Sequence, residues 1–423
     1  MTSSASINSS RLLERFLRYV RIDTTANPDS TAYPSSPGQL ELGRLLAEEL
    51  RGMGAQGVEH DSYGLVWATI PANLSHTDVG QVPTLLFNAH LDTSPEASGQ
   101  GVAPQVIESY EGGDIPLPRD ERVIRVNDCP ELRDLLGHCL VTTDGTTLLG
   151  GDDKAGVAVI MELARHLLEQ PHLPHGEVRV LFTCDEEIGR GAQHMDLDKA
   201  AALAAYTLDG SGQGEVEAEN FSADQIVVQA IGNNIHPSLG KGRMINAIRG
   251  LGCLLAELPL DRLSPETTAG REGFMHPYDI KGGVNRAELK ILLRDFDTAR
   301  LDDYEQLLRS AAEKVERQLP GLRFQFNRQR QYRNMADFIR PLPQVVDVAT
   351  QAWRELGLPY QLGAIRGGTD GAQFSEMGLP TPNLSVGQHN IHSVLEFASL
   401  TQMVAAARHA LKLLELWHLH ARS

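Results

Sequence analysis

The sequence predicts an α/β fold, in which helices cover both faces of a largely parallel sheet and a smaller α+β domain is inserted into the chain. Up to about residue 220, short apolar runs typical of buried strands alternate with segments that carry apolar residues at helical spacing. The pattern changes after that point and returns near residue 343. Since 423 residues are enough for two or three domains with their own cores, we expect a discontinuous first domain, 1–220 and 334–423, and an inserted domain, 221–333.

The first domain is expected to begin with two helices, because apolar positions recur at helical spacing over residues 11–20 and 39–53. Strands are expected where the apolar runs are short, at residues 64–70, 83–89, 177–183 and 204–208. A stretch rich in Gly, Pro and Asp is expected to be irregular, at residues 93–146. The domain is completed by a helix at 154–169, an α/β segment at 343–356 and a C-terminal helix at about 397–417.

The inserted domain is expected to be a small α+β unit. Its strand-like segments are residues 226–231, 287–294 and 322–326. Its helix-like segments are residues 244–258 and 301–318. Clefts between domains are where small-molecule sites are most often found.

Composition excludes several classes of partner. The 38 basic and 55 acidic residues give a net charge of −17, which repels phosphate backbones and anionic lipid, so we expect no nucleic-acid partner and no membrane partner. No run approaches the roughly 18 apolar residues of a membrane span, and the first residues lack the features of a secretory signal. The four cysteines have no CxxC spacing and are expected to be reduced thiols of a cytoplasmic protein.

The first candidate motif is His90-Leu91-Asp92, which directly follows the predicted strand 83–89. Residues i and i+2 of a strand point to the same side, so the imidazole and the carboxylate can touch. A metal-bound histidine commonly donates its other ring N–H to a carboxylate. The motif is weak by itself, and a surface turn with a polar pair remains the alternative.

Acidic residues follow two more predicted elements of the same sheet. Asp152 and Asp153 stand where a loop enters the helix 154–169, although one aspartate would suffice as an N-cap worth about 1 kcal/mol. Asp185, Glu186 and Glu187 follow the strand 177–183, where three acids in a row could also form a solvated loop.

Two further residues complete the set: Asp209 follows the strand 204–208, and His392 precedes the C-terminal helix. Ligands of open α/β sheets gather outside the carboxyl ends of the strands. Two histidines with three carboxylates suit a pair of zinc-type ions that share one carboxylate. Two ions contribute +4 and the three carboxylates −3, so a shared hydroxide makes the site neutral, as burial requires. Glu186 is then a spare carboxylate that can take the proton from that water.

Taken together, the motifs resemble those of the dinuclear zinc aminopeptidase/deacylase family. The resemblance is carried by Asn-Ala-His-Leu-Asp-Thr, Gly-Asp-Asp-Lys-Ala-Gly, Asp-Glu-Glu-Ile-Gly-Arg-Gly-Ala, Leu-Asp-Gly and Gly-Asn-Asn-Ile-His-Pro. Further matching stretches lie at residues 241–247, 294–297 and 365–371. The similarity spans nearly the whole chain in collinear order. Each motif alone has little specificity, whereas the combination is highly specific.

The resemblance implies two zinc ions per subunit. The ions would share five ligands with Asp152 as the bridge: His90, Asp152 and Asp209 for one ion, and Asp152, Glu187 and His392 for the other. Asp92 would orient His90, and Glu186 would be the general base and then the general acid.

The resemblance also implies a fold and a role for the inserted domain. We expect a zinc-exopeptidase-like three-layer catalytic domain, with the inserted α+β domain as a lid that also mediates a homodimer. His236 of the lid would point toward the tetrahedral oxyanion. Arg294 and Arg366 would bind a substrate carboxylate, since arginine offers a bidentate fork, although a structural ion pair remains an equal alternative for both.

The implied activity is that of a zinc-dependent aminopeptidase that releases the N-terminal residue of tripeptides. An N-acyl amino acid deacylase or a carboxypeptidase would use the same metal pair and remains the first alternative. A metal-free homologue that serves as a binding module is the second, and it is disfavoured because all five candidate ligands and the base are present.

Overall fold

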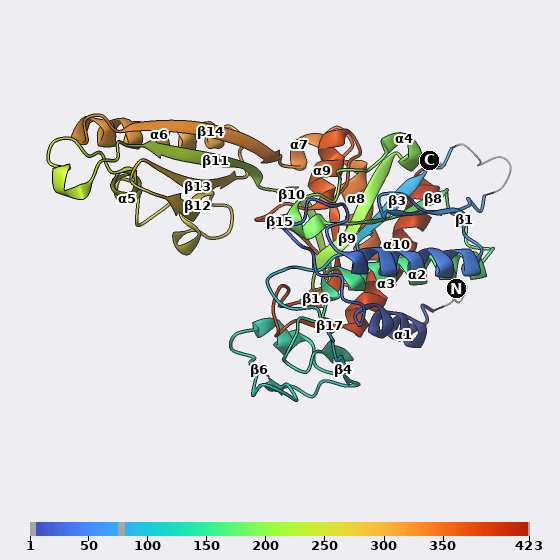
Figure 1. Ribbon diagram of the computed structural model, residues 1–423. Helices are drawn as coiled ribbons and strands as arrows, with labels where there is room; N and C mark the ends of the chain where they lie inside the picture. Colours follow the sequence, from blue (N-terminus) through green and yellow to red (C-terminus); the bar gives the residue numbers. More distant parts are fainter. Residues whose placement is uncertain (1–5, 75–80, 422–423) are drawn as a thin grey trace. The chain divides into compact units, whose positions relative to one another are not determined.

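The computed structural model describes residues 6–74 and 81–421, which divide into two compact units (Figure 1). The first unit takes its residues from Met1–Ala218, Asp337–Gly363 and Thr369–Ser423. The second takes its residues from Glu219–Ala336 and Ala364–Gly368, so the chain enters it twice. Within the described ranges, no helix is both long enough and apolar enough to cross a membrane.

The first unit is built on an 11-stranded mixed sheet, whose main path runs β1-β2-β8-β3-β9-β16-β17-β7-β4, while β10 pairs with β15 and β16. Its strands are β1 (Gln56–His60), β2 (Val66–Ile70), β3 (Leu85–His90), β4 (Gln105–Ile107), β7 (Leu140–Thr142), β8 (Val178–Thr183), β9 (Ala204–Ser211), β10 (Glu215–Asn220), β15 (Gln361–Ile365), β16 (Asn383–His389) and β17 (Phe397–Ser399). The neighbours β8, β3, β9 and β16 are parallel, whereas the outer pairs are antiparallel. The α/β class is confirmed, but the expectation of a largely parallel sheet is wrong, because an apolar run records burial and not strand direction.

Helices cover both faces of this sheet and give it three layers. They are α1 (Ser9–Tyr19), α2 (Pro37–Met53), α3 (Gly151–Glu169), α4 (Leu197–Ala200), α7 (Ala336–Ile339), α8 (Gln344–Glu355), α9 (Asp370–Met377) and α10 (Leu400–His420). Alternate strand residues point to opposite faces. Phe87 of β3 therefore packs in one core with α1, α2, α3, α8 and α10, while its neighbour Leu86 packs in a second core with Phe374 of α9.

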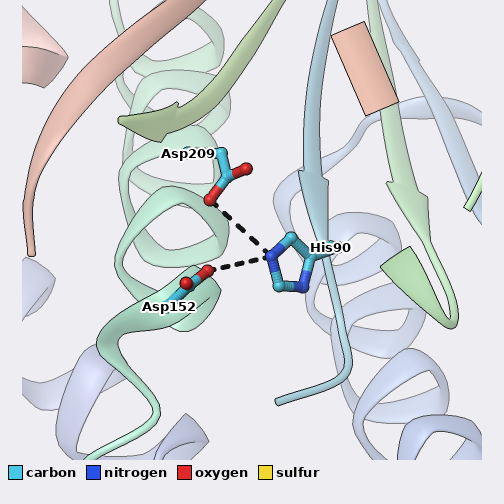
Figure 2. Close-up of side chains that lie close together, drawn as sticks. All are labelled: His90, Asp152 and Asp209. Carbon is cyan, nitrogen blue, oxygen red and sulfur yellow. Dashed lines mark hydrogen bonds and ion pairs between the residues drawn. The ribbon is translucent and has the colours of Figure 1, made fainter. Parts of the chain in front are cut away.

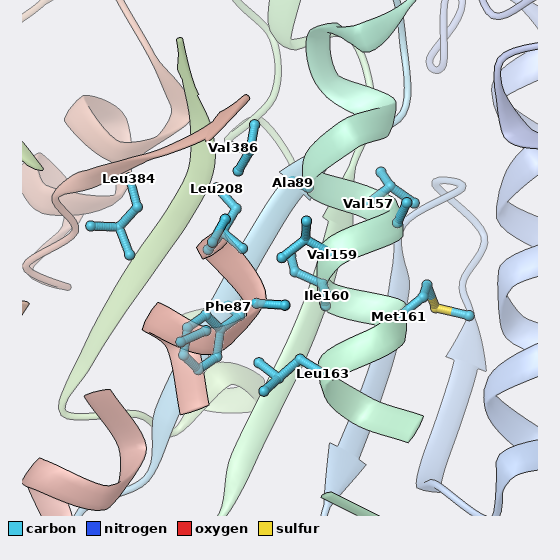
Figure 3. Packing of buried hydrophobic residues seen from close by; sticks show 14 of the residues in the cluster. Phe87, Ala89, Val157, Val159, Ile160, Met161, Leu163, Leu208, Leu384 and Val386 are labelled. Carbon is cyan, nitrogen blue, oxygen red and sulfur yellow. The ribbon is translucent and has the colours of Figure 1, made fainter. Parts of the chain in front are cut away.

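Helix α3 is buried on nearly all sides and lies within the larger core. Figure 3 shows Val159, Ile160 and Leu163 of this helix close to Phe87 of β3, and all four side chains are buried. A helix that is buried in this way is held by its surroundings on nearly every side. Its first turn, which contains Asp152, is therefore fixed against the sheet.

The stretch between β3 and α3 is mostly irregular, as expected, with short elements only. They are β4, β5 (Ile115–Pro116), β6 (Val123–Ile124), the 3₁₀ helix η1 (Pro130–Asp134) and β7. A small separate core that includes Tyr110, Ile115, Leu132 and Phe397 holds this segment in place.

The second unit consists of a four-stranded antiparallel sheet in the order β12-β13-β11-β14 and two helices that share one hydrophobic core with it. Its elements are β11 (Ser222–Ile231), η3 (Pro237–Leu239), α5 (Ala247–Ala256), η4 (Pro265–Thr267), β12 (Phe274–Gly282), β13 (Arg286–Asp295), α6 (Arg300–Gln318) and β14 (Arg323–Tyr332). The expected α+β elements all occur. Strand β12 was missed because Pro277 weakens the strand pattern, and proline is tolerated there because β12 lies at the edge of the sheet.

Candidate metal centre

The site residues of the first unit lie where the parallel strands end. His90 is the last residue of β3, and it pairs with Thr183, the last residue of β8. Glu187 follows β8 in the 3₁₀ helix η2 (Glu186–Ile188), and Asp209 lies near the end of β9. Because neighbouring parallel strands end at one edge of the sheet, these side chains arrive at the same place. Asp152 reaches this edge from the first turn of α3, and His392 from the loop after β16.

One group of side chains joins His90, Asp152 and Asp209 (Figure 2). The Nε2 atom of His90 lies 3.0 Å from Oδ1 of Asp152 and 3.7 Å from Oδ1 of Asp209. The potential ligand atoms of the three residues lie within 4.8 Å of one another. His90 is buried and its ring cannot turn freely, so Nε2 is held toward the two carboxylates.

A second group joins Asp152, Glu187 and His392. The Nε2 atom of His392 lies 3.3 Å from Oδ2 of Asp152 and 3.0 Å from Oε2 of Glu187. Asp152 therefore presents one oxygen to each histidine, which is the arrangement that a carboxylate shared by two ions requires.

Asp92 links the first histidine to the acidic loop. Its Oδ1 atom lies 3.4 Å from Nδ1 of His90, and that ring nitrogen is also 3.1 Å from the backbone oxygen of Asp92. The two carboxylate oxygens accept hydrogen bonds from the backbone N–H groups of Glu186 and Glu187, each at 3.0 Å. One buried carboxylate thus orients the His90 ring and fixes the backbone of both glutamates.

The three acidic residues after β8, Asp185, Glu186 and Glu187, lie in different environments. Asp185 is buried and turns away, since its carboxylate accepts hydrogen bonds from the backbone N–H of Ser35 and from the side chain of Gln39. Glu186 and Glu187 are half-buried. Burial raises the pKa of Glu186 well above its ordinary value, and the charges of Asp370 and Asp209 add to the effect.

Crowding of like charges is the main electrostatic feature of the site. Burial and the charge of Asp152 raise the pKa of Glu187 to about 8 and that of Asp209 to about 7. Burial opposes ionisation of Asp152 too, but hydrogen bonds from His392 and His90 hold its pKa well below the usual range. Burial would lower the pKa of His392, but hydrogen bonds to Asp152 and Glu187 raise it to about 11. Such a cluster favours added positive charge.

The donor set fits divalent cations. Carboxylate oxygens and imidazole nitrogens are the usual ligands of zinc-type ions outside thiolate sites. The Oε1 atom of Glu187 is buried and has no hydrogen-bond partner among residues 6–74 and 81–421, so this oxygen is available to a ligand. His90, Asp152, Asp209, Glu187 and His392 are therefore the residues that would hold the metal.

The other predicted site residues belong to the second unit. His236 is exposed at the start of η3, with its Nδ1 atom 2.7 Å from the hydroxyl of Ser238. The guanidinium of Arg366 donates to the backbone oxygens of Gly270 and Glu272 and to the hydroxyl of Thr268, so its donors are largely used within the unit.

Arg294 differs from Arg366 in how many of its guanidinium N–H groups donate hydrogen bonds within the protein. Its Nη1 atom donates to the backbone oxygen of Arg366 at 3.4 Å, which is a long contact. Its buried Nε atom finds no partner in the part of the chain that the structure describes. Of the two arginines, Arg294 is the one whose guanidinium has capacity left for a carboxylate.

Three polar residues around the ligands were missed by the sequence motifs. Gln388 donates to the backbone oxygen of Asp209 at 2.8 Å, and Asn383 accepts from the backbone N–H of Asp209 at 3.2 Å. Glu396 accepts a hydrogen bond from the backbone N–H of Asp152 at 3.0 Å. A polar residue within an apolar run is the one available signal, and for Glu396 it is visible as the acid in Leu395-Glu396-Phe397-Ala398.

Taken together, the three-layer α/β unit and the shared-carboxylate donor set define a metal-dependent hydrolase. The sequence pattern of peptidase family M20/M25/M40 matches residues 142–416. The chain belongs to this family. Family membership and the donor set together imply a divalent metal cofactor.

Similar proteins cover nearly the whole chain. Proteins called Peptidase T from Escherichia fergusonii and Geobacillus thermodenitrificans are each 44% identical over 407 residues, which is 96% of this chain and 98% of theirs. Among solved structures, an aminopeptidase PepT from Bacillus cereus has a TM-score of 0.74 at 23% identity, covering 97% of this chain and 99% of its own. A tripeptidase from Staphylococcus aureus has a TM-score of 0.76 at 22% identity, covering 99% and 100%. These structures share the fold.

Proposed function

We propose that the chain is an aminopeptidase that removes the N-terminal residue from tripeptides and uses two zinc ions per subunit. The observation that carries the proposal is the position of Asp152, which presents one carboxylate oxygen to His90 and the other to His392. Two adjacent donor sets that share a carboxylate fit a pair of ions. The substrate class is supported by the Peptidase T relatives, which match this chain over 96% of its length.

The chain's own residues supply binding and proton transfer. A pair of divalent metal ions held by the five ligands would polarise the peptide carbonyl and make water a better nucleophile. Glu186 is the carboxylate that accepts the proton of the attacking water and returns it to the leaving amine. The Asp92 carboxylate keeps Glu186 in place by accepting a hydrogen bond from the backbone N–H of Glu186. We assign His236 to stabilisation of the oxyanion and Arg294 to the substrate carboxylate.

Hydrolysis of Met-Gly-Gly tests the proposal directly. We expect cleavage of the free tripeptide that is lost with a chelator and restored by zinc. Its dipeptide, tetrapeptide, N-acetylated and C-amidated counterparts should react at least about tenfold more slowly. Each of them lacks or misplaces one charged terminus, and a lost contact to a charged group costs about 1.5–3 kcal/mol. Cleavage of the N-acetylated peptide alone would contradict the proposal and assign the chain to the deacylases.

Arg294 is expected to determine how well the substrate carboxylate is bound. The Arg294→Ala change should lower kcat/KM for the free tripeptide by about 10–100-fold, mainly through KM, because a charge-assisted hydrogen bond is lost. The C-amidated peptide has no carboxylate to lose, so its much lower kcat/KM should remain nearly unchanged. The measurement is the ratio of kcat/KM for the two peptides in the wild type and the variant.

Arg366→Ala is the matched control for Arg294→Ala. Because the Arg366 guanidinium holds backbone oxygens of its own unit, its loss should lower the melting temperature and leave the preference for the free peptide intact. An Arg294→Ala protein with the wild-type ratio of the two peptides would remove Arg294 from substrate binding.

We further propose a cytoplasmic enzyme that forms a homodimer through the second unit. The four cysteines are free in the structure, which suits a reducing compartment. The dimer is supported by the family resemblance, and sedimentation of the purified chain at several concentrations tests it.

A further inference from the structure

Glu396 is a buried residue whose carboxylate contacts the candidate metal centre through backbone N–H groups of the loop before α3. Its Oε2 atom accepts hydrogen bonds from the backbone N–H groups of Leu149 and Gly150, both at 2.8 Å. Its Oε1 atom accepts from the backbone N–H of Asp152 at 3.0 Å. With only 1% of its surface exposed, Glu396 is held entirely by the protein, and both of its oxygens are used by one short loop.

The loop that leads into α3 is shaped to fit around this carboxylate. Gly150 has a positive φ of 77°, which glycine adopts without steric cost. At Gly151, an added Cβ would stand 3.1 Å from Oε1 of Glu396, closer than side-chain atoms normally approach. The two glycines thus let the N–H groups of Leu149, Gly150 and Asp152 converge on one side chain, as in an anion-binding loop.

Glu396 also belongs to the segment that carries His392. Its backbone N–H donates to the oxygen of Ser393 at 3.2 Å, which closes a turn directly after the histidine. The carboxylate of Glu396, at the end of this turn, accepts from the backbone N–H of Asp152, and the imidazole of His392, just before the turn, lies 3.3 Å from Oδ2 of the same aspartate. Two segments more than 240 residues apart in sequence are therefore joined at the shared ligand.

We propose that Glu396 is a positioning residue for the metal centre, which sets where Asp152 stands relative to His392. This role rests on the proposed metal-dependent function, since it acts through a ligand of the metal. Groups that orient metal ligands typically contribute 10–100-fold to metal affinity. Glu396 differs from Asp92 in that it holds the backbone of the ligand Asp152, whereas Asp92 contacts the ring of the ligand His90.

The test is the affinity for zinc of the Glu396→Gln protein, measured by competition with a chromophoric chelator. Glutamine keeps the shape of the side chain, but its amide must place an N–H group against one of the backbone donors. We expect the dissociation constant of the weaker-bound zinc to rise by about 10–100-fold. The visible spectrum of the cobalt-substituted protein should change as well, because the shared ligand has moved. Glu396→Asp keeps the charge and should recover part of the affinity.

Glu162→Gln is the matched control, because Glu162 is equally buried on α3 but is paired with Arg11 and Arg15. It should lower the melting temperature of the metal-free protein and leave the zinc affinity unchanged. A Glu396→Gln protein that binds zinc within twofold of the wild type would overturn the proposal, as would an equal loss of affinity in the control. If Glu396→Gln does not fold, Glu396→Asp carries the comparison. Because the readout is zinc affinity, a wild-type protein that binds zinc but cleaves no tripeptide would refute only the proposed activity.

Discussion

The Glu186→Gln protein is expected to keep its fold and its metal while kcat for a tripeptide falls by about 10²–10⁴-fold, the range that general acid–base catalysis supplies. Glu186 lies next to the proposed ligand Glu187 but belongs to neither ligand group. Its link to Asp92 runs through the backbone N–H, so the change leaves that contact intact. Glutamine matches the size of glutamate and cannot accept the proton. The measurement is kcat together with the metal content of the same sample.

The neighbouring change Glu187→Gln is the control, because Glu187 points to His392 with its Oε2 atom. It should lower the metal content, and added zinc should restore part of its activity. The two variants are thus expected to lose different properties: Glu186→Gln loses catalysis, and Glu187→Gln loses metal binding. A Glu186→Gln protein that keeps more than a tenth of the wild-type kcat, or that loses metal as Glu187→Gln does, would contradict the role of Glu186.

The sequence predicted that the candidate ligands lie close together, because nearly all of them follow a strand of one sheet or begin a helix that packs on it. His90 ends β3 and Asp209 lies near the end of β9, and these two strands are parallel neighbours. Parallel pairing brings such residues together whatever the loops do between them. The pairing of Asp92 with His90 could likewise be predicted from a spacing of two residues, because it is local.

Contacts between distant segments could not be predicted in this way. The position of Glu396 follows from β17 pairing with β16 and β7, and the three-residue strand β17 leaves almost no apolar pattern. The partners of Arg366 are backbone oxygens of a loop about 95 residues earlier, which no residue type reveals. The antiparallel direction of the outer strands was missed for the same reason: strand direction depends on tertiary pairing, whereas periodicity reports burial alone.

Replacing the shared ligand is expected to have the largest effect on metal binding. In an Asp152→Asn protein, one of the two anionic oxygens becomes an amide that faces either His90 or His392. Both donor groups lose charge at once, so metal content should fall from about two ions per chain to below one. Activity should fall by more than about 10²-fold, which exceeds the usual effect of changing a residue outside the ligand set. Atomic emission on dialysed protein gives the stoichiometry, and added zinc should restore little activity.

Asp153→Asn separates this effect from simple disturbance of the loop. Asp153 is the next residue and is fully buried, but its carboxylate accepts backbone N–H groups of His90 and Gly156 and belongs to neither ligand group. Its burial raises its pKa well above the ordinary value, so an amide resembles its protonated form. The change should lower the melting temperature and remove much less metal than Asp152→Asn, because Asp153 reaches the metal centre only through the backbone N–H of His90. Equal metal loss in both variants would mean that the loop, and not the Asp152 carboxylate, is what the metal requires.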